Sequence, residues 1–301
     1  MSEEIFPDWD RDTRMPGPPP PPGSCDCQFH IFHDDTKKYP AKPNAYYQPL
    51  KGSSYEDARG MLGAMGFSRG VIVHAMPYDT DHGLLIDTLE GLSPEGRRNT
   101  RATAIIKDNV TDATLERLNR AGVRGARFNI GRKYSESSPL DSVRRSMDRA
   151  REIGWHAKLH INGEDVLDFA DFLNGVKNLT MVIDHMAHLH FADGLDQPAA
   201  RWIVDKLKSD ENWWMLCSNG NRDSTMQQGY DDAVPFGHAF IAAAPDRMVW
   251  GSDWPHVRWR GKRMMNDAEA VELLYRYVDN DAALIKKVLV DNPARLYDFA
   301  D

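Results

Sequence analysis

Short apolar runs alternate with helix-patterned stretches along most of this chain of 301 residues. Brief apolar runs are typical of buried strands, and apolar residues at i, i+3 and i+4 are typical of amphipathic helices. The predicted strands lie near 25–32, 70–73, 103–106, 125–128, 156–159, 180–183, 214–217 and 248–250. The predicted helices lie near 55–65, 81–89, 112–121, 140–153, 164–173, 198–208, 232–243, 266–277 and 282–290. This alternation predicts an α/β protein with a parallel sheet.

Eight strands with intervening helices favour a (β/α)8 TIM barrel. A doubly wound open sheet has a similar rhythm, but no glycine-rich phosphate-binding loop follows a strand to support it. Gly66, Gly91, Gly122 and Gly154 fall just past predicted helix ends, where a left-handed residue often terminates a helix. We therefore expect one barrel domain over residues 24–301.

The N-terminal 23 residues differ in composition from the rest of the chain. They end in the low-complexity stretch PGPPPPPG over residues 16–23. Consecutive prolines favour a stiff, extended backbone. We interpret residues 1–23 as a Pro-rich lead-in that lies on the barrel, and a ligand for a proline-binding module is the alternative.

Composition narrows the classes of partner. The 37 basic and 45 acidic residues leave a net charge of −8, which argues against a nucleic-acid or anionic-membrane partner. No apolar run approaches the ~18 residues of a membrane span. The acidic start MSEEIFPDWDRD lacks the pattern of a signal peptide. With only three cysteines, we expect a cytoplasmic protein, and a homo-oligomer is compatible with the sequence.

Polar side chains stand where the predicted strands end. In a (β/α)8 barrel the carboxyl ends of the strands carry the active site, so these residues should converge at one mouth. The strand-end residues are Gln28, His30, His74, Lys107, Asp108, Arg127, Asn129, Lys158, His160, Asp184, His185, 218–222, Ser252 and Asp253.

The first strand carries a candidate polar pair. Side chains alternate between faces along a strand, so Gln28 and His30 should share the barrel interior while Cys27 and Phe29 face the helices. A hydrogen-bonded core pair is the structural alternative. Cys25 and Cys27 are interpreted as packing residues on the outward face, because a lone Cys-x-Cys is weak evidence for zinc.

Acidic and basic candidates complete the predicted site. Asp253 follows the last strand, where it could serve as a general base or merely cap the next turn. Arg127 and Arg222 directly follow apolar strands and would form a cationic pocket, with Arg132 or Lys133 nearby. Such a pocket suits a small molecule that carries a carboxylate or a sulfonate.

The chain resembles the amidohydrolase superfamily, in the branch that contains lactonases of 2-pyrone-4,6-dicarboxylate. The resemblance covers nearly all of residues 25–299. It is carried by CDCQFHIF, GFSRGVIVHAMPYDTDHGLLIDTL, AGVRGARFNI, REIGWHAKLHINGEDV, VIDHMAHL, RMVWGSDWPH and VLVDNPARLYDF. Other relatives open sulfomuconolactone or sugar-derived lactones, or isomerise galactarolactone. The resemblance implies a TIM barrel and a lactone substrate, with aromatic-compound breakdown as the setting.

Site residues carry over from this branch by position. The strand-1 motif His-x-His is Gln28-Phe29-His30 here. The implied catalytic residues are Gln28, His30, His185 and Asp253. The implied substrate-binding positions are Tyr46, Arg127, Arg132, Lys133, His160, His188 and Arg222. His160 replaces the tyrosine of the dicarboxylate lactonase and His188 replaces an arginine, so the resemblance does not by itself carry over the dicarboxylate as the substrate.

Gln28 also bears on the cofactor. Many amidohydrolases hold a divalent metal with the His-x-His pair, a later histidine and the strand-8 aspartate, whereas the lactonase branch includes a metal-free enzyme. An amide is a poor zinc ligand compared with imidazole. We expect no cofactor. One zinc or manganese ion at His30, His185 and Asp253 is the alternative.

These features predict hydrolysis of a small anionic lactone. Asp253 would take a proton from the attacking water, while His30, His185 and Gln28 would donate hydrogen bonds to the developing oxyanion. Arg127 and Arg222 would hold the anionic groups. A lactone isomerase and a barrel that binds its ligand without turnover are the two alternatives.

Overall fold

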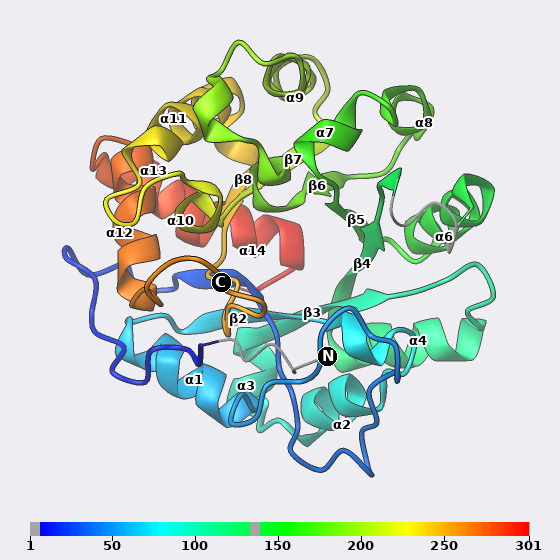
Figure 1. Cartoon of the computed structure of the whole chain (residues 1–301). Helices are drawn as coiled ribbons and strands as arrows, with labels where there is room; N and C mark the ends of the chain where they lie inside the picture. The colour runs from blue at the N-terminus through cyan, green and yellow to red at the C-terminus, as the bar shows by residue number, and fades with distance from the viewer. Residues whose placement is uncertain (1–6, 133–138, 301) are drawn as a thin grey trace.

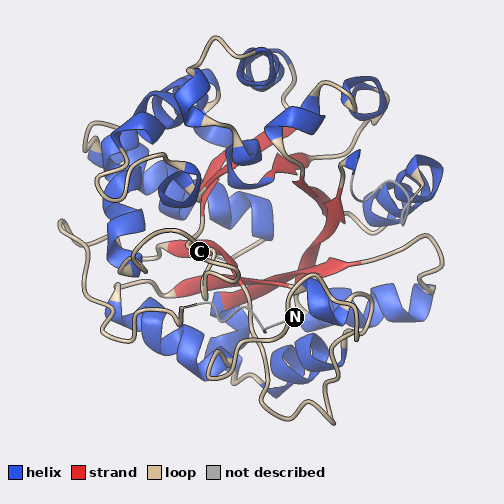
Figure 2. Ribbon diagram, viewed as in Figure 1, coloured by secondary structure: helices blue, strands red, loops and turns tan. Residues whose placement is uncertain are grey.

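Eight parallel strands form a single sheet in sequential order that curls into a barrel (Figures 1 and 2). The computed structural model describes residues 7–132 and 139–300, so Lys133 lies outside the described residues. The strands are β1 (Cys25–Phe29), β2 (Arg69–Val73), β3 (Thr100–Ile105), β4 (Val123–Asn129), β5 (His156–His160), β6 (Met181–Ile183), β7 (Trp213–Cys217) and β8 (Met248–Trp250). A backbone bridge from Phe29 to Trp254 brings β1 beside the end of β8. The predicted (β/α)8 barrel is confirmed and the open doubly wound sheet is excluded.

Helices surround the strands on the outside of the barrel (Figure 2). They are α1 (Tyr55–Ala64), α2 (Gly83–Gly91), α3 (Pro94–Asn99), α4 (Asp112–Ala121), α6 (Leu140–Glu152), α7 (Gly163–Val166), α8 (Ala170–Asn174), α9 (Pro198–Ser209), α10 (Gly220–Asp223), α11 (Val234–Ala243), α12 (Asp267–Tyr277), α13 (Ala282–Lys286) and α14 (Asn292–Tyr297). The single helix predicted over 164–173 is wrong, because the chain forms α7 and α8 there. Every helix within the described ranges is too short or too polar to cross a membrane.

Local capping explains where several helices begin and end. Ser54 and Asp57 form a capping box at the start of α1, which satisfies two otherwise unpaired N–H groups. Gly122 ends α4 in a left-handed conformation with φ 116°. Gly91 does not follow this prediction, because it is the last residue of α2 and the helix ends at an extended Leu92.

Two apolar layers hold the barrel together. The larger layer packs the outward faces of the strands against the helices and includes Phe29 and Ile72. The smaller layer fills the inside of the barrel and includes Cys25, Cys27 and Val182. Cys25 and Cys27 therefore both face inward, not toward the helices as predicted. The register of β1 against β2 shifts between Asp26 and Phe29, and such an irregularity breaks the alternation of faces.

The N-terminal segment packs against the end of β8 and against α12. The Trp9 ring lies 5.1 Å from that of Trp254 in an edge-to-face arrangement, and Arg14 pairs with Glu272 at 2.6 Å. Trp254 directly follows Asp253, so this segment supports the loop that carries the predicted base.

Candidate active site

A cavity of about 270 Å³ opens at the carboxyl ends of the strands. Its lining residues come from six of the loops that follow strands and from the ends of β4 and β5. They are His30, Tyr46, Tyr47, Met76, Arg127, His160, Asn162, His185, His188, Asn219, Arg222, Asp253, Val257, Arg258 and Arg260. Eight residues predicted from the sequence therefore lie around one cavity. Gln28 lies behind it, fully buried.

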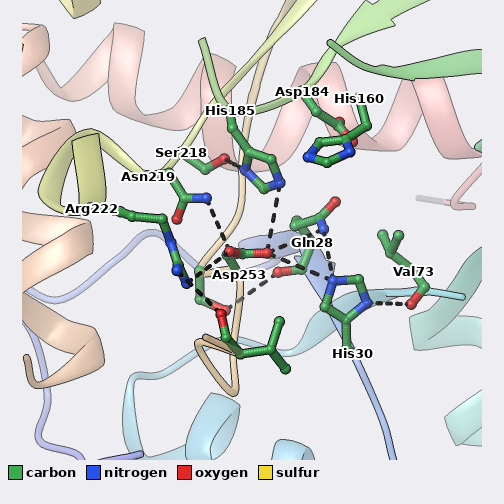
Figure 3. A network of polar contacts seen from close by, with 12 residues as sticks. Gln28, His30, Val73, His160, Asp184, His185, Ser218, Asn219, Arg222 and Asp253 are labelled. Atoms are coloured by element: carbon green, nitrogen blue, oxygen red, sulfur yellow. Dashed lines mark hydrogen bonds and ion pairs between the residues drawn. The ribbon is translucent and has the colours of Figure 1, made fainter. Parts of the chain in front are cut away.

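Asp253 lies in this cavity and contacts residues from three other loops (Figure 3). The Asn219 amide donates to its Oδ2 at 3.0 Å, and an Arg222 N–H donates to the same oxygen at 3.4 Å. Its Oδ1 faces the Nε2 atoms of His30 and His185, each at 3.7 Å. Its side chain therefore binds distant residues and does not cap the next turn.

The protonation of Asp253 follows from these neighbours. Burial alone would raise its pKa, whereas Arg222, the Asn219 N–H and a positive charge on His185 or His30, where those rings are protonated, lower it, and the pKa lies below its usual range. Burial lowers the pKa of His30 to about 4 and that of His185 well below its usual value. Since both rings are neutral at pH 7, Arg222 and Asn219 are the groups that keep Asp253 ionised.

Hydrogen bonding fixes the ring of His30 as an acceptor toward the site. Its Nδ1 lies 2.7 Å from the carbonyl oxygen of Val73, which can only accept. Nδ1 therefore carries the proton, and Nε2 of the neutral ring presents a lone pair. Gln28 donates to it across 3.4 Å. The predicted role of His30 as an oxyanion donor is wrong for this tautomer.

His185 has the opposite arrangement. Its Nδ1 lies 2.7 Å from the Ser218 hydroxyl, which can donate. A protonated Nε2 then faces the Asp253 carboxylate and the cavity, which is favourable beside a negative charge. His185 is therefore the imidazole that can donate a hydrogen bond to a developing oxyanion.

Gln28 connects His30 with Asp253. Its Nε2 lies 3.4 Å from both His30 Nε2 and Asp253 Oδ1. Turned over, the amide would place its oxygen against a lone pair and a carboxylate, so the N–H groups must face them. Because Gln28 does not line the cavity, it orients its two partners. The structure does not support its predicted role as an oxyanion donor.

The backbone below Asp253 is fixed by a buried carboxylate. Asp26 accepts hydrogen bonds from the Ser252 N–H at 3.0 Å, the Ser252 hydroxyl at 2.6 Å and the Gln28 N–H at 2.9 Å. Burial raises the pKa of Asp26 to about 7 against these donors. These bonds join β1 to Ser252, the residue before Asp253. Asp253 itself has a left-handed backbone, with a φ of 64°.

Four arginines surround the cavity. Arg127 and Arg222 were predicted, and Arg127 is only 4% exposed. Arg258 and Arg260 were not singled out from the sequence, although they lie in the basic stretch HVRWRGKR after the last strand. The guanidinium of Arg258 stacks over the ring of Tyr46 at 3.7 Å. The cavity is therefore strongly cationic within a chain of net charge −8.

The remaining predicted residues have different surroundings. His160 Nδ1 lies 2.9 Å from Asn129 Oδ1, and His188 Nδ1 lies 2.9 Å from Asp223 Oδ2. Both rings line the cavity. Arg132 does not line it, since its guanidinium pairs with Asp165 at 2.9 Å at the surface.

The groups around Asp253 do not match a metal site. The amide nitrogen of Gln28 contacts two of the three proposed ligands, and an amide N–H donates hydrogen bonds without offering a lone pair to a metal. Within residues 7–132 and 139–300, no cluster of three or more His, Cys, Asp or Glu side chains is arranged to hold a metal ion. Zinc or manganese at His30, His185 and Asp253 would have to displace the Gln28 amide from two of these residues.

Comparison with curated proteins finds relatives that span nearly the whole chain. A 2-pyrone-4,6-dicarboxylate hydrolase of Comamonas testosteroni is 30% identical, covering 96% of this chain and 95% of the relative. A 4-sulfomuconolactone hydrolase of Rhizobium radiobacter is 33% identical over 92% of this chain and 90% of the relative. A D-galactarolactone isomerase of Agrobacterium fabrum is 29% identical over 94% of this chain and 93% of the relative.

A solved structure also matches nearly the whole chain. A protein of Pseudomonas putida, described as a candidate 2-pyrone-4,6-dicarboxylic acid hydrolase, superposes with a TM-score of 0.77 at 27% identity. The match covers 93% of this chain and 98% of that protein. The Amidohydro_2 family model, described as amidohydrolase, matches residues 25–299. With the barrel, the strand-end residues and this match, the chain belongs to the amidohydrolase family Amidohydro_2.

Proposed function

We propose that this protein hydrolyses a small lactone that carries one or more anionic groups. The observation that carries the proposal is an ionised, buried Asp253 beside a cavity lined by Arg127, Arg222, Arg258 and Arg260. An ionised carboxylate can accept a proton from water, and the guanidinium groups favour carboxylate or sulfonate substituents. The relatives named for 2-pyrone-4,6-dicarboxylate and 4-sulfomuconolactone support this substrate class.

The proposed reaction begins with a water molecule held by Asp253. The arginines fix the anionic groups so that the lactone carbonyl lies beside this water. Asp253 takes a proton as the water attacks, and His185 Nε2–H donates to the oxygen that becomes negative. One such donor contributes roughly 10²–10³ in rate. Asp253 then returns its proton to the ring oxygen as the acyl C–O bond breaks, which leaves a hydroxy acid.

Arg222 can adjust the basicity of Asp253 during this cycle. Its N–H lies 3.4 Å from Asp253 Oδ2 in the free protein, where its positive charge weakens the base. A substrate anion that draws Arg222 toward itself removes part of this stabilisation, and the pKa of Asp253 rises toward that of an effective base. Substrate binding and base activation would thus be coupled through one guanidinium.

We also propose that this chemistry needs no metal. Gln28 provides the support: its N–H groups occupy the contacts to His30 and Asp253 that a metal would make. An ester carbonyl is reactive enough for attack assisted by a general base and hydrogen-bond donors. A cytoplasmic location is proposed on the three buried, unpaired cysteines, which suit a reducing compartment.

A panel of lactones followed by proton release tests the function. It comprises 2-pyrone-4,6-dicarboxylate, 4-sulfomuconolactone, sugar-diacid lactones and uncharged analogues. We expect turnover of at least one anionic lactone and much weaker turnover of its uncharged analogue. Equal rates on both would contradict the proposal. Reaction in ¹⁸O-labelled water separates hydrolysis, which incorporates the label into the product, from isomerisation, which does not.

A further inference from the structure

A buried cluster of three charges lies inside the barrel next to the cavity. It consists of Arg127 on β4, Lys158 on β5 and Asp184 directly after β6. The Lys158 and Asp184 side chains are fully buried, and that of Arg127 is 4% exposed. Arg127 and Lys158 are paired in register on neighbouring strands. Of the three, only Arg127 lines the cavity.

Two cations in this cluster share one carboxylate unequally. Lys158 Nζ lies 2.6 Å from Asp184 Oδ1, whereas Arg127 Nε lies 3.8 Å from Asp184 Oδ2. None of the contacts within this cluster is a hydrogen bond among the described residues, since Arg127 Nε and Nη1, Lys158 Nζ and both Asp184 oxygens have no hydrogen-bond partner there. Because attraction falls with distance and the lysine is closer, Asp184 mainly compensates Lys158. One carboxylate thus balances two cations, so the cluster keeps a net positive charge, and Arg127 is the cation that faces the cavity.

This arrangement is unusual for a buried arginine. A guanidinium taken out of water is normally paired closely, and the two-pronged contact with a carboxylate is its preferred geometry. Asp184 would be the natural partner of Arg127, since it follows β6 directly and faces the same interior. Lys158, however, lies closer to that carboxylate than Arg127 does, at 2.6 Å from Asp184 Oδ1.

We propose that Lys158 is a positioning residue, which takes Asp184 as its counter-ion and thereby keeps the charge of Arg127 directed at the cavity for an anionic substrate. The inference rests on the proposed function, because it assigns Arg127 to substrate binding. Without Lys158, Asp184 would pair directly with Arg127 and withdraw it from the cavity. Lys158 would then control substrate affinity without touching the substrate.

Replacing Lys158 by methionine tests this idea, since methionine keeps most of the side-chain volume and removes the charge. Crystal structures of the wild type and Lys158→Met show directly where the Arg127 guanidinium lies. We expect Arg127 to move to about 2.8 Å from Asp184 in the variant. KM for 2-pyrone-4,6-dicarboxylate, or Kd by calorimetry if this compound binds without turnover, should rise at least about tenfold, while kcat changes less than about twofold.

The double variant Lys158→Met/Asp184→Asn distinguishes positioning from structural support. It removes both the competitor and the carboxylate, so Arg127 should face the cavity again and KM should return to within about threefold of wild type. His156→Leu is the matched control, because this buried residue precedes Lys158 by two positions on β5. It should lower thermal stability without changing KM.

Several outcomes would overturn the inference. Arg127 could stay in place in Lys158→Met with unchanged affinity, or the double variant could remain as impaired as the single one. Asp184→Asn alone provides a second route if Lys158→Met fails to fold, and it should leave KM unchanged or lower. A raised KM in Asp184→Asn would show that Asp184 itself holds Arg127 in place.

Arg127→Met separates this inference from the proposed function. If it leaves affinity for anionic lactones unchanged, the proposed binding role of Arg127 fails. If Arg127→Met weakens binding but Lys158→Met does not, only the positioning role of Lys158 fails.

Discussion

Replacing Asp253 by asparagine removes the proposed base while keeping the shape of the side chain. Asparagine cannot accept a water proton, so the chemical step should lose the contribution of general-base catalysis. That contribution is typically 10²–10⁴ in rate, which corresponds to about 3–5 kcal/mol in barrier height.

The fold should survive this change. Asn219 and Arg222 lose a charged partner, but an amide oxygen at position 253 still accepts from Asn219. The backbone contacts of the Asp253 loop also remain, including its N–H to Gln28 O at 2.8 Å. We therefore expect a folded protein that binds anionic lactones nearly as well as the wild type.

The assay is proton release from the best lactone of the panel, with circular dichroism and calorimetric binding as controls. Asn219→Ala is a matched control, since it removes a hydrogen bond to the same oxygen but leaves the base, and it should lower kcat much less. If Asp253→Asn keeps more than about a tenth of wild-type kcat, a loss below about 1.4 kcal/mol, Asp253 is not the base.

Three further predictions concern the groups around Asp253. Arg127→Met and Arg222→Met should each raise KM for anionic lactones, because a lost desolvated charge contact costs on the order of 2–5 kcal/mol, and normal KM values in both variants would contradict the anion site. Burial would lower the pKa of His188, but Asp223 outweighs burial and raises it above 6.5. The ion pair between protonated His188 and Asp223 should therefore contribute fully to binding and stability below pH 6.5. It should be lost as the pH rises through the raised pKa of His188. KM should increase over that range, and His188→Gln should abolish the increase after correction for spontaneous lactone hydrolysis. Gln28→His should raise zinc affinity in calorimetric titrations without raising activity, and a gain in kcat with bound zinc would refute the metal-free interpretation.

The barrel could be predicted because each strand is a compact apolar run. β5 was expected near 156–159 and lies at His156–His160, while β6 was expected near 180–183 and lies at Met181–Ile183. Once the strand ends are known, the location of the site can also be predicted, because a (β/α)8 barrel brings Asp253, His185 and Arg222 to the same mouth. The main elements of the site are thus encoded in local patterns.

Other features depend on contacts between distant residues. The shift in β1 that turns Cys27 inward has no signature in an alternating pattern. Arg258 and Arg260 reach the cavity through a loop with left-handed residues at His256 and Arg258, and loops have no periodicity to read. The acceptor role of His30 depends on the carbonyl of Val73, a contact that only the packed barrel reveals.

The predicted helix over 164–173 failed for a similar reason. The Asp165 side chain is buried and pairs with Arg132. Between the two short helices, the Phe169 N–H donates a hydrogen bond to the backbone carbonyl of Asp165. A tertiary ion pair thus fixes the first turn, while the exposed Leu167 shows that the apolar periodicity does not mark a buried face.

The metal content of the active protein tests the central claim most directly, because that claim assigns the chemistry to Asp253 and His185 alone. Elemental analysis of purified protein is combined with lactone turnover before and after dialysis against a chelator. We predict well below one equivalent of any divalent metal and unchanged turnover after dialysis. One equivalent of zinc or manganese, with activity lost on its removal and restored on its return, would contradict the account.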